Sequence, residues 1–176
     1  MDCLLTENKG FSLIELAVVM ILLIILAAIG IPNLGKVMPR YHLKEAARNL
    51  YGDFQLAKAT AIKEGTPCTV EFINGGYQIF LDLNQNLERD GNETSNQYLV
   101  KSVSWSSFDD VQVDSTGGIT FQANNNGNPA ISFLTNGLTA NNGGGFGAGT
   151  VNLASSVNNN MKIQITVGST GNIRIP

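Results

Sequence analysis

One long uncharged apolar segment near the N-terminus limits what this chain can fold into. Between Phe11 and Ile31 the only charged residue is Glu15. A helix rises about 1.5 Å per residue, so this segment would be about 30 Å long, enough to cross a bilayer. A carboxylate inside such a segment is costly in lipid, and it usually marks a functional site that has a partner. The sequence therefore predicts a membrane-spanning helix over residues 11–31, with a functional acid at Glu15.

The rest of the chain is long enough for one soluble domain. The chain has 176 residues, and the part after the apolar segment, about 140 residues, is an ordinary domain size. A formal net charge of −3 argues against a nucleic-acid-binding surface. The two cysteines, Cys3 and Cys68, lie in different contexts. We therefore expect no disulfide framework, and we expect Cys68 to be a small buried apolar side chain.

Two ordinary explanations of the apolar segment leave part of it unexplained. A secretory signal would be shorter, would end in a cleavage site of small residues, and would not contain an acid. A plain single-pass signal anchor explains the length. It does not explain Glu15 or the Gly10–Phe11 junction that precedes the apolar run.

The residues around this junction match a known export signal. The segment Lys9-Gly10-Phe11-Ser12-Leu13-Ile14-Glu15-Leu16 resembles the class III signal of type IV pilins and of the pseudopilins of type II secretion. This resemblance implies that a prepilin peptidase/N-methyltransferase removes the leader 1–10 by cutting between Gly10 and Phe11. It also implies N-methylation of Phe11 and a role for Glu15 in filament assembly. Pro32 matches a proline that is common in the family.

A physical argument agrees with the role that the resemblance gives to Glu15. A carboxylate is tolerated in lipid when a cation neutralises it. The amine of Phe11 on a neighbouring subunit would supply that cation in the same membrane plane. Each pair of Glu15 with the Phe11 amine would join one subunit to the next, shifted by one step along the filament. These pairs would then drive assembly and set its register.

The charges that flank the apolar segment give a conflicting indication of orientation. The leader contains Asp2, Glu7 and Lys9, whereas a basic row of Lys36, Arg40, Lys44 and Arg48 follows the segment. By the positive-inside rule the soluble domain would stay in the cytoplasm. The resemblance implies instead a single-pass inner-membrane protein with a periplasmic soluble domain, and we adopt that expectation. The basic row is either a solvated helix face or a contact with lipid head groups.

An amphipathic helix is predicted over residues 32–65. Apolar residues recur at helical spacing, at Leu43, Ala47, Leu50, Phe54, Ala57 and Ala61. Gly65 and Pro67 are expected to end this helix. Pro32 and Pro39 each remove a helix hydrogen bond, so we expect kinks or local melting at these two positions.

The β-rich remainder, residues 66–176, alternates short apolar runs with polar turns. The predicted strands are Cys68–Phe72, Tyr77–Leu81, Tyr98–Val103, Gly118–Phe121, Ala130–Leu134, Thr150–Leu153, Met161–Val167 and Asn172–Ile175. Asn74-Gly75-Gly76 is the expected turn of a first hairpin. An antiparallel sheet packed on the apolar helix stripe would give an α+β domain. The Gly-rich run 141–149 lacks phosphate-binding spacing and is predicted to be a flexible loop.

Within the pilin-like proteins, the soluble half is most similar to the GspH/FimT group of minor pseudopilins and minor pilins. The similar features are Ala46–Leu50, Gln55–Gly65, the first hairpin and the closing Gly171–Ile175. This resemblance implies a structural subunit whose partners are other pilin or pseudopilin subunits. A pilus-tip subunit that binds a ligand or DNA is the alternative. Members that bind DNA carry an arginine-rich tail where this chain has only Arg174, so nucleic acid is not an expected partner.

An acidic segment after the second predicted strand has the spacing of a calcium loop. Oxygen-bearing side chains occupy offsets 1, 3, 5, 7, 9 and 12, at Asp82, Asn84, Asn86, Glu88, Asp90 and Glu93. Calcium is therefore the candidate cofactor. Leu87 stands where such a loop needs glycine. The alternative is an acidic, Asn-rich connection between strands.

The sequence contains no recognisable catalytic set. His42 stands alone on the predicted helix, and Cys68 has no histidine near it in sequence. An enzyme is accordingly the weakest of the functional hypotheses, behind a structural subunit and a ligand-binding tip subunit.

Overall fold

The computed structural model describes residues 10–175, apart from the side chains of residues 32–36. The chain divides into two compact units, which meet between Met38 and Pro39. Helix α1 (Leu13–Glu64) contains 52 residues and runs through both units. Its backbone is helical at Pro32 and at Pro39, so the expectation of local melting there was wrong. A proline removes one hydrogen bond, whereas melting the helix would free several backbone groups in an apolar surrounding.

The C-terminal part of α1 forms one side of the domain core. All six residues of the predicted apolar stripe are buried: Leu43, Ala47, Leu50, Phe54, Ala57 and Ala61. Gly65 follows the last helical residue with φ +64°, the left-handed conformation that ends many helices and that glycine adopts without strain. The predicted stripe and the predicted helix end are therefore both confirmed.

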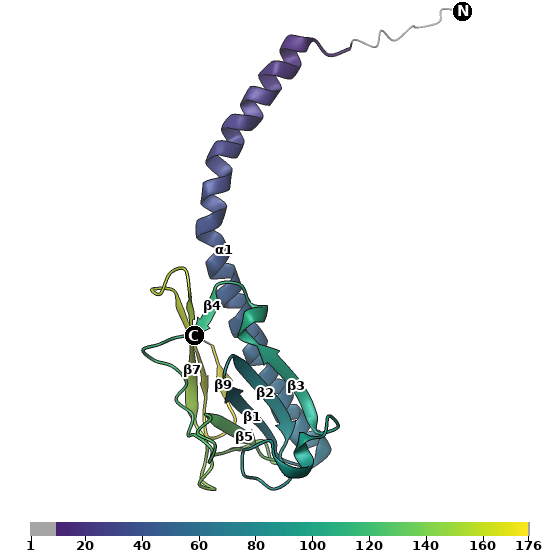
Figure 1. The fold of residues 1–176 in the computed structure, drawn as a ribbon, viewed down its shortest axis with the longest axis vertical. Helices are drawn as coiled ribbons and strands as arrows, with labels where there is room; N and C mark the ends of the chain where they lie inside the picture. Colours follow the sequence, from purple (N-terminus) through teal and green to yellow (C-terminus); the bar gives the residue numbers. More distant parts are fainter. Residues whose placement is uncertain (1–9, 176) are drawn as a thin grey trace, which may run out of the picture. The chain divides into compact units, whose positions relative to one another are not determined.

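The strands form two antiparallel sheets beside this part of α1 (Figure 1). The five-stranded sheet has the order β3-β2-β1-β5-β6. Its strands are β1 (Cys68–Ile73), β2 (Gly76–Leu81), β3 (Leu99–Ser104), β5 (Ala130–Phe133) and β6 (Thr139–Ala140). The four-stranded sheet has the order β4-β7-β8-β9. Its strands are β4 (Val111–Val113), β7 (Gly149–Ser155), β8 (Lys162–Val167) and β9 (Ile173–Arg174). Two short 3-10 helices, η1 (Gly91–Thr94) and η2 (Trp105–Ser107), lie in the connections.

The strand predictions were correct for the longer elements and for the two-residue β9, and they missed two other short strands. The hairpin around Asn74 and Gly75 is confirmed, because β1 and β2 pair with Ile73 opposite Gly76. Gly118–Phe121 is not a strand and contributes a single bridge, between Ile119 and Val151. Strands β4 and β6 were missed, since three and two residues are too few to show an alternating pattern.

Aromatic rings join the helix to the sheets. The ring of Phe54 on α1 lies 6.3 Å from that of Phe72, 6.0 Å from that of Phe121 and 6.3 Å from that of Phe133, measured between centroids. These residues belong to one continuous buried cluster to which α1 and both sheets contribute. A helix packed on antiparallel sheets over a shared core confirms the predicted α+β class.

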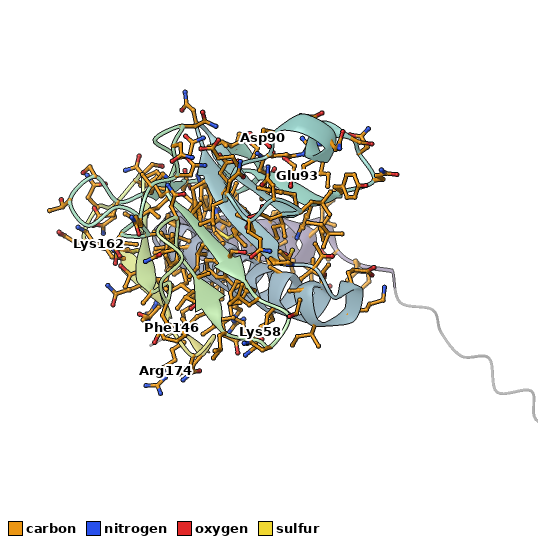
Figure 2. All side chains as sticks on the ribbon, turned by 90° about the horizontal axis from the view of Figure 1, so that it is seen from below. Lys58, Asp90, Glu93, Phe146, Lys162 and Arg174 are labelled. Atoms are coloured by element: carbon orange, nitrogen blue, oxygen red, sulfur yellow. The ribbon has the colours of Figure 1, made fainter. Side chains whose placement is uncertain are left out.

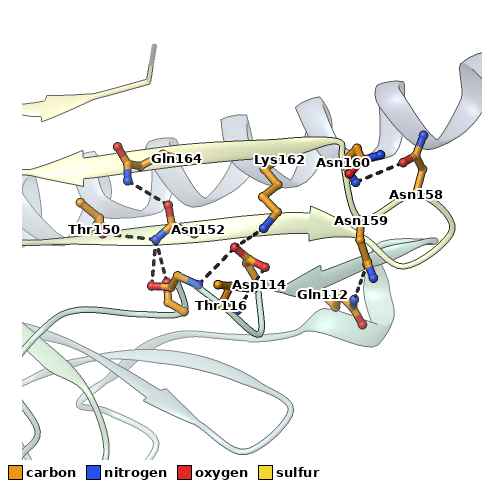
Figure 3. A network of polar contacts seen from close by, with 12 residues as sticks. Gln112, Asp114, Thr116, Thr150, Asn152, Asn158, Asn159, Asn160, Lys162 and Gln164 are labelled. Carbon is orange, nitrogen blue, oxygen red and sulfur yellow. Dashed lines mark hydrogen bonds and ion pairs between the residues drawn. The ribbon is translucent and has the colours of Figure 1, made fainter.

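A polar network fixes the segment 114–118, which follows β4 of the four-stranded sheet (Figure 3). Lys162 Nζ on β8 lies 2.8 Å from Asp114 Oδ2, and this hydrogen-bonded ion pair holds the pKa of Asp114 below its usual value. Asn152 Nδ2 on β7 donates to the carbonyls of Gly117 and Gly118 at 3.0 and 3.1 Å. Backbone bonds join the same segment to β7, from the Asp114 amide to the Asn152 carbonyl at 2.8 Å and from the Asn152 amide to the Gly118 carbonyl at 3.0 Å. Residues 114–118 are therefore held against β7 and β8 by side-chain and backbone contacts together.

Candidate functional site

The first candidate site lies at the start of α1. Gly10 and Phe11 precede the helix, and Glu15 lies in its first turn. All three residues are exposed, and the Leu16 amide donates to the Ser12 carbonyl at 3.1 Å. The other residues of the predicted leader, 1–9, lie outside the described residues. The cleavage, methylation and assembly roles of Gly10, Phe11 and Glu15 stay predictions.

The helix that follows is apolar on every side. Leu13–Ile31 is a stretch of 19 residues with a mean hydropathy of 3.0, long and apolar enough to cross a membrane, and none of its residues is buried. A continuous apolar surface of this size is not stable against water. The segment therefore requires lipid or apolar partner helices around it.

The position of Glu15 in the first turn of α1 brings one favourable interaction with its own helix. A carboxylate in the first turn of a helix interacts favourably with the helix dipole, by about 0.3–1 kcal/mol at an exposed site. In lipid this contribution is small beside the cost of an unpaired charge. The dipole alone does not compensate that cost.

The basic row after the apolar segment lies beside the buried stripe of α1. Arg40, Lys44 and Arg48 are exposed, whereas Leu43 and Ala47 on the adjacent face of the helix are buried. The side chain of Lys36 lies outside the described residues. The arrangement is compatible with a solvated face and with contact to lipid head groups.

The second candidate site is the acidic segment 82–93, between β2 and the end of η1. Asp82 is fully buried and fixes the start of this segment. Its backbone amide donates to the Pro67 carbonyl at 2.8 Å. Its Oδ2 accepts hydrogen bonds from Thr69 Oγ1 at 2.8 Å and from the Leu87 amide at 3.0 Å. The carboxylate of Asp82 therefore holds the loop in a closed turn.

Two predicted ligands converge on a third. Asn84 Nδ2 donates to Asp90 Oδ1 at 2.9 Å, and Asn86 Nδ2 donates to Asp90 Oδ2 at 3.0 Å. The two asparagine side chains thus bracket the Asp90 carboxylate. The structure brings Asn84, Asn86 and Asp90 together through these hydrogen bonds, whereas their role as metal ligands stays a prediction.

Glu93 closes the segment from inside the domain. It is 2% exposed, and its Oε1 accepts from the amides of Leu83 at 2.6 Å and Asn84 at 3.2 Å. Its Oε2 is buried and has no hydrogen-bond partner among the described residues. Figure 2 shows Glu93 and Asp90 close together beside η1. A buried carboxylate oxygen without a partner is energetically costly.

Glu88 does not join the other predicted ligands. Its Oε1 accepts a hydrogen bond from the Asn126 amide at 3.0 Å. Asn124 Nδ2 in the same loop donates to the Leu87 carbonyl at 2.9 Å and to Glu71 Oε1 at 2.8 Å. The side chain of Glu88 therefore fastens the acidic segment to the loop 124–128, a contact that sequence reasoning did not find.

The position that lacks the expected glycine still makes the sharp turn. Leu87 has φ +63° and Gln85 has φ +60°, a left-handed conformation that costs roughly 1–2 kcal/mol for a residue with a side chain. Leu87 is 2% exposed, and burying its side chain offsets part of that strain. A buried leucine can thus occupy a turn that glycine would occupy more easily.

Burial changes the acidity of two carboxyls in this segment. The pKa of Asp82 is raised by burial, although hydrogen bonds from Thr69 and from the loop amides act against this. Burial also raises the pKa of Glu93, and the charges of Asp82 and Asp90 add to the effect. In the described part of the chain, no Lys or Arg side chain forms an ion pair with either residue.

The acids alone do not make a ready-made metal centre. Within residues 10–175, no three His, Cys, Asp or Glu side chains are grouped closely enough to hold a metal ion. Any cation in this loop therefore needs amide or backbone oxygens as well. The calcium hypothesis stays a prediction.

Neither Cys68 nor His42 lies next to a group that would activate it for catalysis among the described residues. Cys68 is fully buried at the start of β1, and burial together with the nearby Asp82 charge raises its pKa to about 12. A thiol of this kind is unreactive at neutral pH, as expected for a small buried apolar residue. His42 Nδ1 lies 3.7 Å from Asp110 Oδ2 on the partly exposed side of α1.

Comparisons with known proteins agree with this architecture. A family model described as type II transport protein GspH matches residues 46–171, and a model of the prokaryotic N-terminal methylation motif matches residues 6–31. No curated protein matches the chain significantly.

Solved structures share the fold at low sequence identity. The type IV minor pilin FimU of Pseudomonas aeruginosa matches with a TM-score of 0.55 at 12% identity, over 78% of this chain and 90% of that one. The minor pseudopilin EpsH of the type 2 secretion system of Vibrio cholerae matches with a TM-score of 0.52 at 13% identity, over 77% of this chain and 96% of that one.

Proposed function

The chain belongs to the family described as type II transport protein GspH, and we propose that it is a minor structural subunit of a type II secretion pseudopilus or a type IV pilus. One observation carries the proposal. An apolar helix with a carboxylate in its first turn is attached to a domain of the GspH family. The helix supplies a membrane anchor and a filament contact, and the domain supplies a specific outer surface.

The proposal assigns each N-terminal residue a step. Prepilin peptidase removes the leader 1–10, so that Phe11 becomes the N-terminus and is N-methylated. Residues 11–31 then span the inner membrane, with residues 32–176 on the periplasmic side. The match to the N-terminal methylation motif over residues 6–31 supports this order of events.

Assembly follows from the electrostatics of Glu15. An unpaired carboxylate in lipid is unfavourable, and the methylated amine of Phe11 on an adjacent subunit neutralises it. Each subunit thereby presents one cation and one anion about one helical turn apart. Subunits that pair these charges in a staggered order build a filament, and a subunit without the acid has no electrostatic reason to join.

The test is incorporation of a Glu15→Ala variant. We expect the variant to remain in the membrane fraction, since removing a charge from an apolar helix favours insertion. We also expect it to be absent from complexes with the other pilin or pseudopilin subunits after cross-linking. Glu64→Ala is the matched control, because Glu64 is an exposed acid at the other end of α1, and it should assemble normally. Normal incorporation of Glu15→Ala would contradict the proposal.

A further inference from the structure

A groove lies between the first turns of α1 inside the folded domain and the turn that joins β7 to β8. Its volume of about 390 Å³ is within the usual range for sites that hold small molecules. The lining combines cationic and apolar side chains and includes Arg40, Leu43, Lys44, Asn160, Met161 and Lys162. No acid lies among the described residues that line it. The groove is therefore positively charged and partly apolar.

Two of the three cations in this groove have no ion-pair partner in the described part of the chain. Lys162 is paired with Asp114 at 2.8 Å (Figure 3). Arg40 and Lys44 are exposed and form no ion pair with a described residue. They lie four residues apart on α1, where like charges are neighbours, repel each other and weaken the helix. An anion bound between them would remove this repulsion.

The groove lies where the chain enters the folded domain. Pro39 is the first residue of the domain unit, and Arg40 follows Ile31, the last residue of the membrane-length segment, by nine positions. The function proposed above puts these basic residues on the periplasmic side, where the positive-inside rule disfavours them close to a span. A favourable contact with an anion at the membrane surface would offset that disadvantage.

The turn between β7 and β8 adds an exposed apolar side chain beside the groove. Val157 is 66% exposed. One exposed valine is ordinary on a protein surface, but this one belongs to the turn whose later residues, Asn160 and Met161, line the cationic groove. The turn is held by hydrogen bonds, among them one from the Met161 amide to the Asn158 carbonyl at 2.9 Å. Cations combined with apolar contacts suit the head-group region of a bilayer, which offers both anions and hydrocarbon, better than an acidic protein surface.

We propose that this groove binds the head group of an anionic phospholipid from the membrane in which the chain is anchored. The lipid phosphate lies between Arg40 and Lys44, and Met161 contacts its apolar part. Arginine binds a phosphate through two parallel N–H bonds, and lysine binds it as a point charge. Side chains on a helix lean toward its N-terminus, so both cations lean toward the N-terminal end of α1. The inference rests on the membrane anchorage of the proposed function and adds a specific lipid contact to it.

The experiment uses the full chain purified in a neutral detergent. Phosphatidylglycerol or phosphatidylcholine is added at equal concentration, and native mass spectrometry counts the lipid molecules that the chain retains. We expect retention of phosphatidylglycerol at least about fivefold above that of phosphatidylcholine, and a smaller difference at high salt. Glycerol phosphate at the same concentration should not displace the lipid. Equal retention of the two lipids would indicate a protein partner, and displacement by glycerol phosphate would indicate a site for a soluble phosphate; either result overturns the proposal.

Two matched double variants separate the groove from general surface charge. Arg40→Gln with Lys44→Gln should lower the preference for phosphatidylglycerol at least about fivefold, while circular dichroism shows a folded domain. Lys63→Gln with Arg174→Gln removes the same charge from exposed positions outside the groove and should bind like wild type. No loss in the groove variant, or an equal loss in both, overturns the proposal. The assembly test on Glu15 uses cross-linking as its readout, so the two proposals can fail separately.

Discussion

The hydroxyl of Tyr77 donates a hydrogen bond of 2.6 Å to Asp53 Oδ2 and so links β2 to the buried face of α1. Asp53 is 5% exposed, and its other oxygen, Oδ1, lies 2.7 Å from Lys101 Nζ on β3. The burial of the hydroxyl and its bond to Asp53 raise the pKa of Tyr77 far above its usual value. The phenol therefore stays protonated at neutral pH and acts as a donor to Asp53.

Tyr77→Phe should destabilise the domain by about 1.5–3 kcal/mol, the usual range for a hydrogen bond to a charged group. The ion pair between Lys101 and Asp53 remains, so the domain should still fold. Chemical denaturation of the full chain in detergent, followed by near-UV circular dichroism, measures the change.

Tyr51→Phe is the control for this substitution. The hydroxyl of Tyr51 accepts a 3.2 Å bond from Gln55 Nε2 at an exposed site on the same helix. Its removal should change the free energy of unfolding by less than about 0.5 kcal/mol. If the two variants have equal stability, the buried Tyr77–Asp53 bond contributes nothing beyond a surface contact.

Phe54→Ala should cost roughly 3–5 kcal/mol of folding free energy, because it removes a fully buried ring that contacts three others. Leu56→Ala, two residues further along α1, is the comparison, since Leu56 is 39% exposed. It should cost less than about 1 kcal/mol. A loss below about 1 kcal/mol for Phe54→Ala would mean that the stripe does not anchor the core.

The helix and its buried face were predictable because their pattern is local. Leu43, Phe54 and Ala61 follow the 3.6-residue period over almost twenty residues, and no distant contact is needed to recognise that period. The hairpin at Asn74 and Gly75 was equally local, since the turn type follows from the two residues themselves.

The contacts of the acidic loop depend on the tertiary structure and were not predictable. The spacing of Asp82, Asn84, Asn86 and Asp90 suggested a set of calcium ligands, and that role stays a prediction. It could not show that Glu88 faces Asn126, 38 residues away. It also gave no sign that Leu87 would accept a left-handed backbone, because the burial that offsets this strain comes from the folded domain.

The mature protein should begin at N-methylated Phe11. The small residue Gly10 leaves the peptide bond open to a membrane peptidase, and a Gly10→Val substitution should block cleavage by covering it. Mass spectrometry of the chain from membranes that contain prepilin peptidase should show the N-terminal peptide starting at Phe11, heavier by one methyl group. A Gly52→Val control, a glycine with open space around it on α1, should be processed normally. An intact Met1 in assembled filaments would rule out this processing step.

Glu93→Gln should stabilise the chain relative to wild type in EGTA, and by more at neutral pH than near pH 4. Burial raises the pKa of Glu93 in the folded state, so the folded chain holds this proton more tightly than the unfolded chain does. The stability that the carboxyl contributes is then complete below its unfolded pKa of about 4.3 and is lost as the pH rises through the higher folded value.

The glutamine variant does not titrate, so the difference between variant and wild-type melting temperatures should grow as the pH rises. Asp114 has a lowered pKa, so its contribution to stability is lost as the pH falls, the opposite of Glu93. This contribution is the same in both chains and cancels when the two melting temperatures are subtracted. Melting curves at about pH 4, 5.5 and 7 in EGTA give the comparison. A difference that stays constant across these values would show that Glu93 has the same affinity for its proton in the folded and unfolded chains. Folding would then not raise the pKa of Glu93.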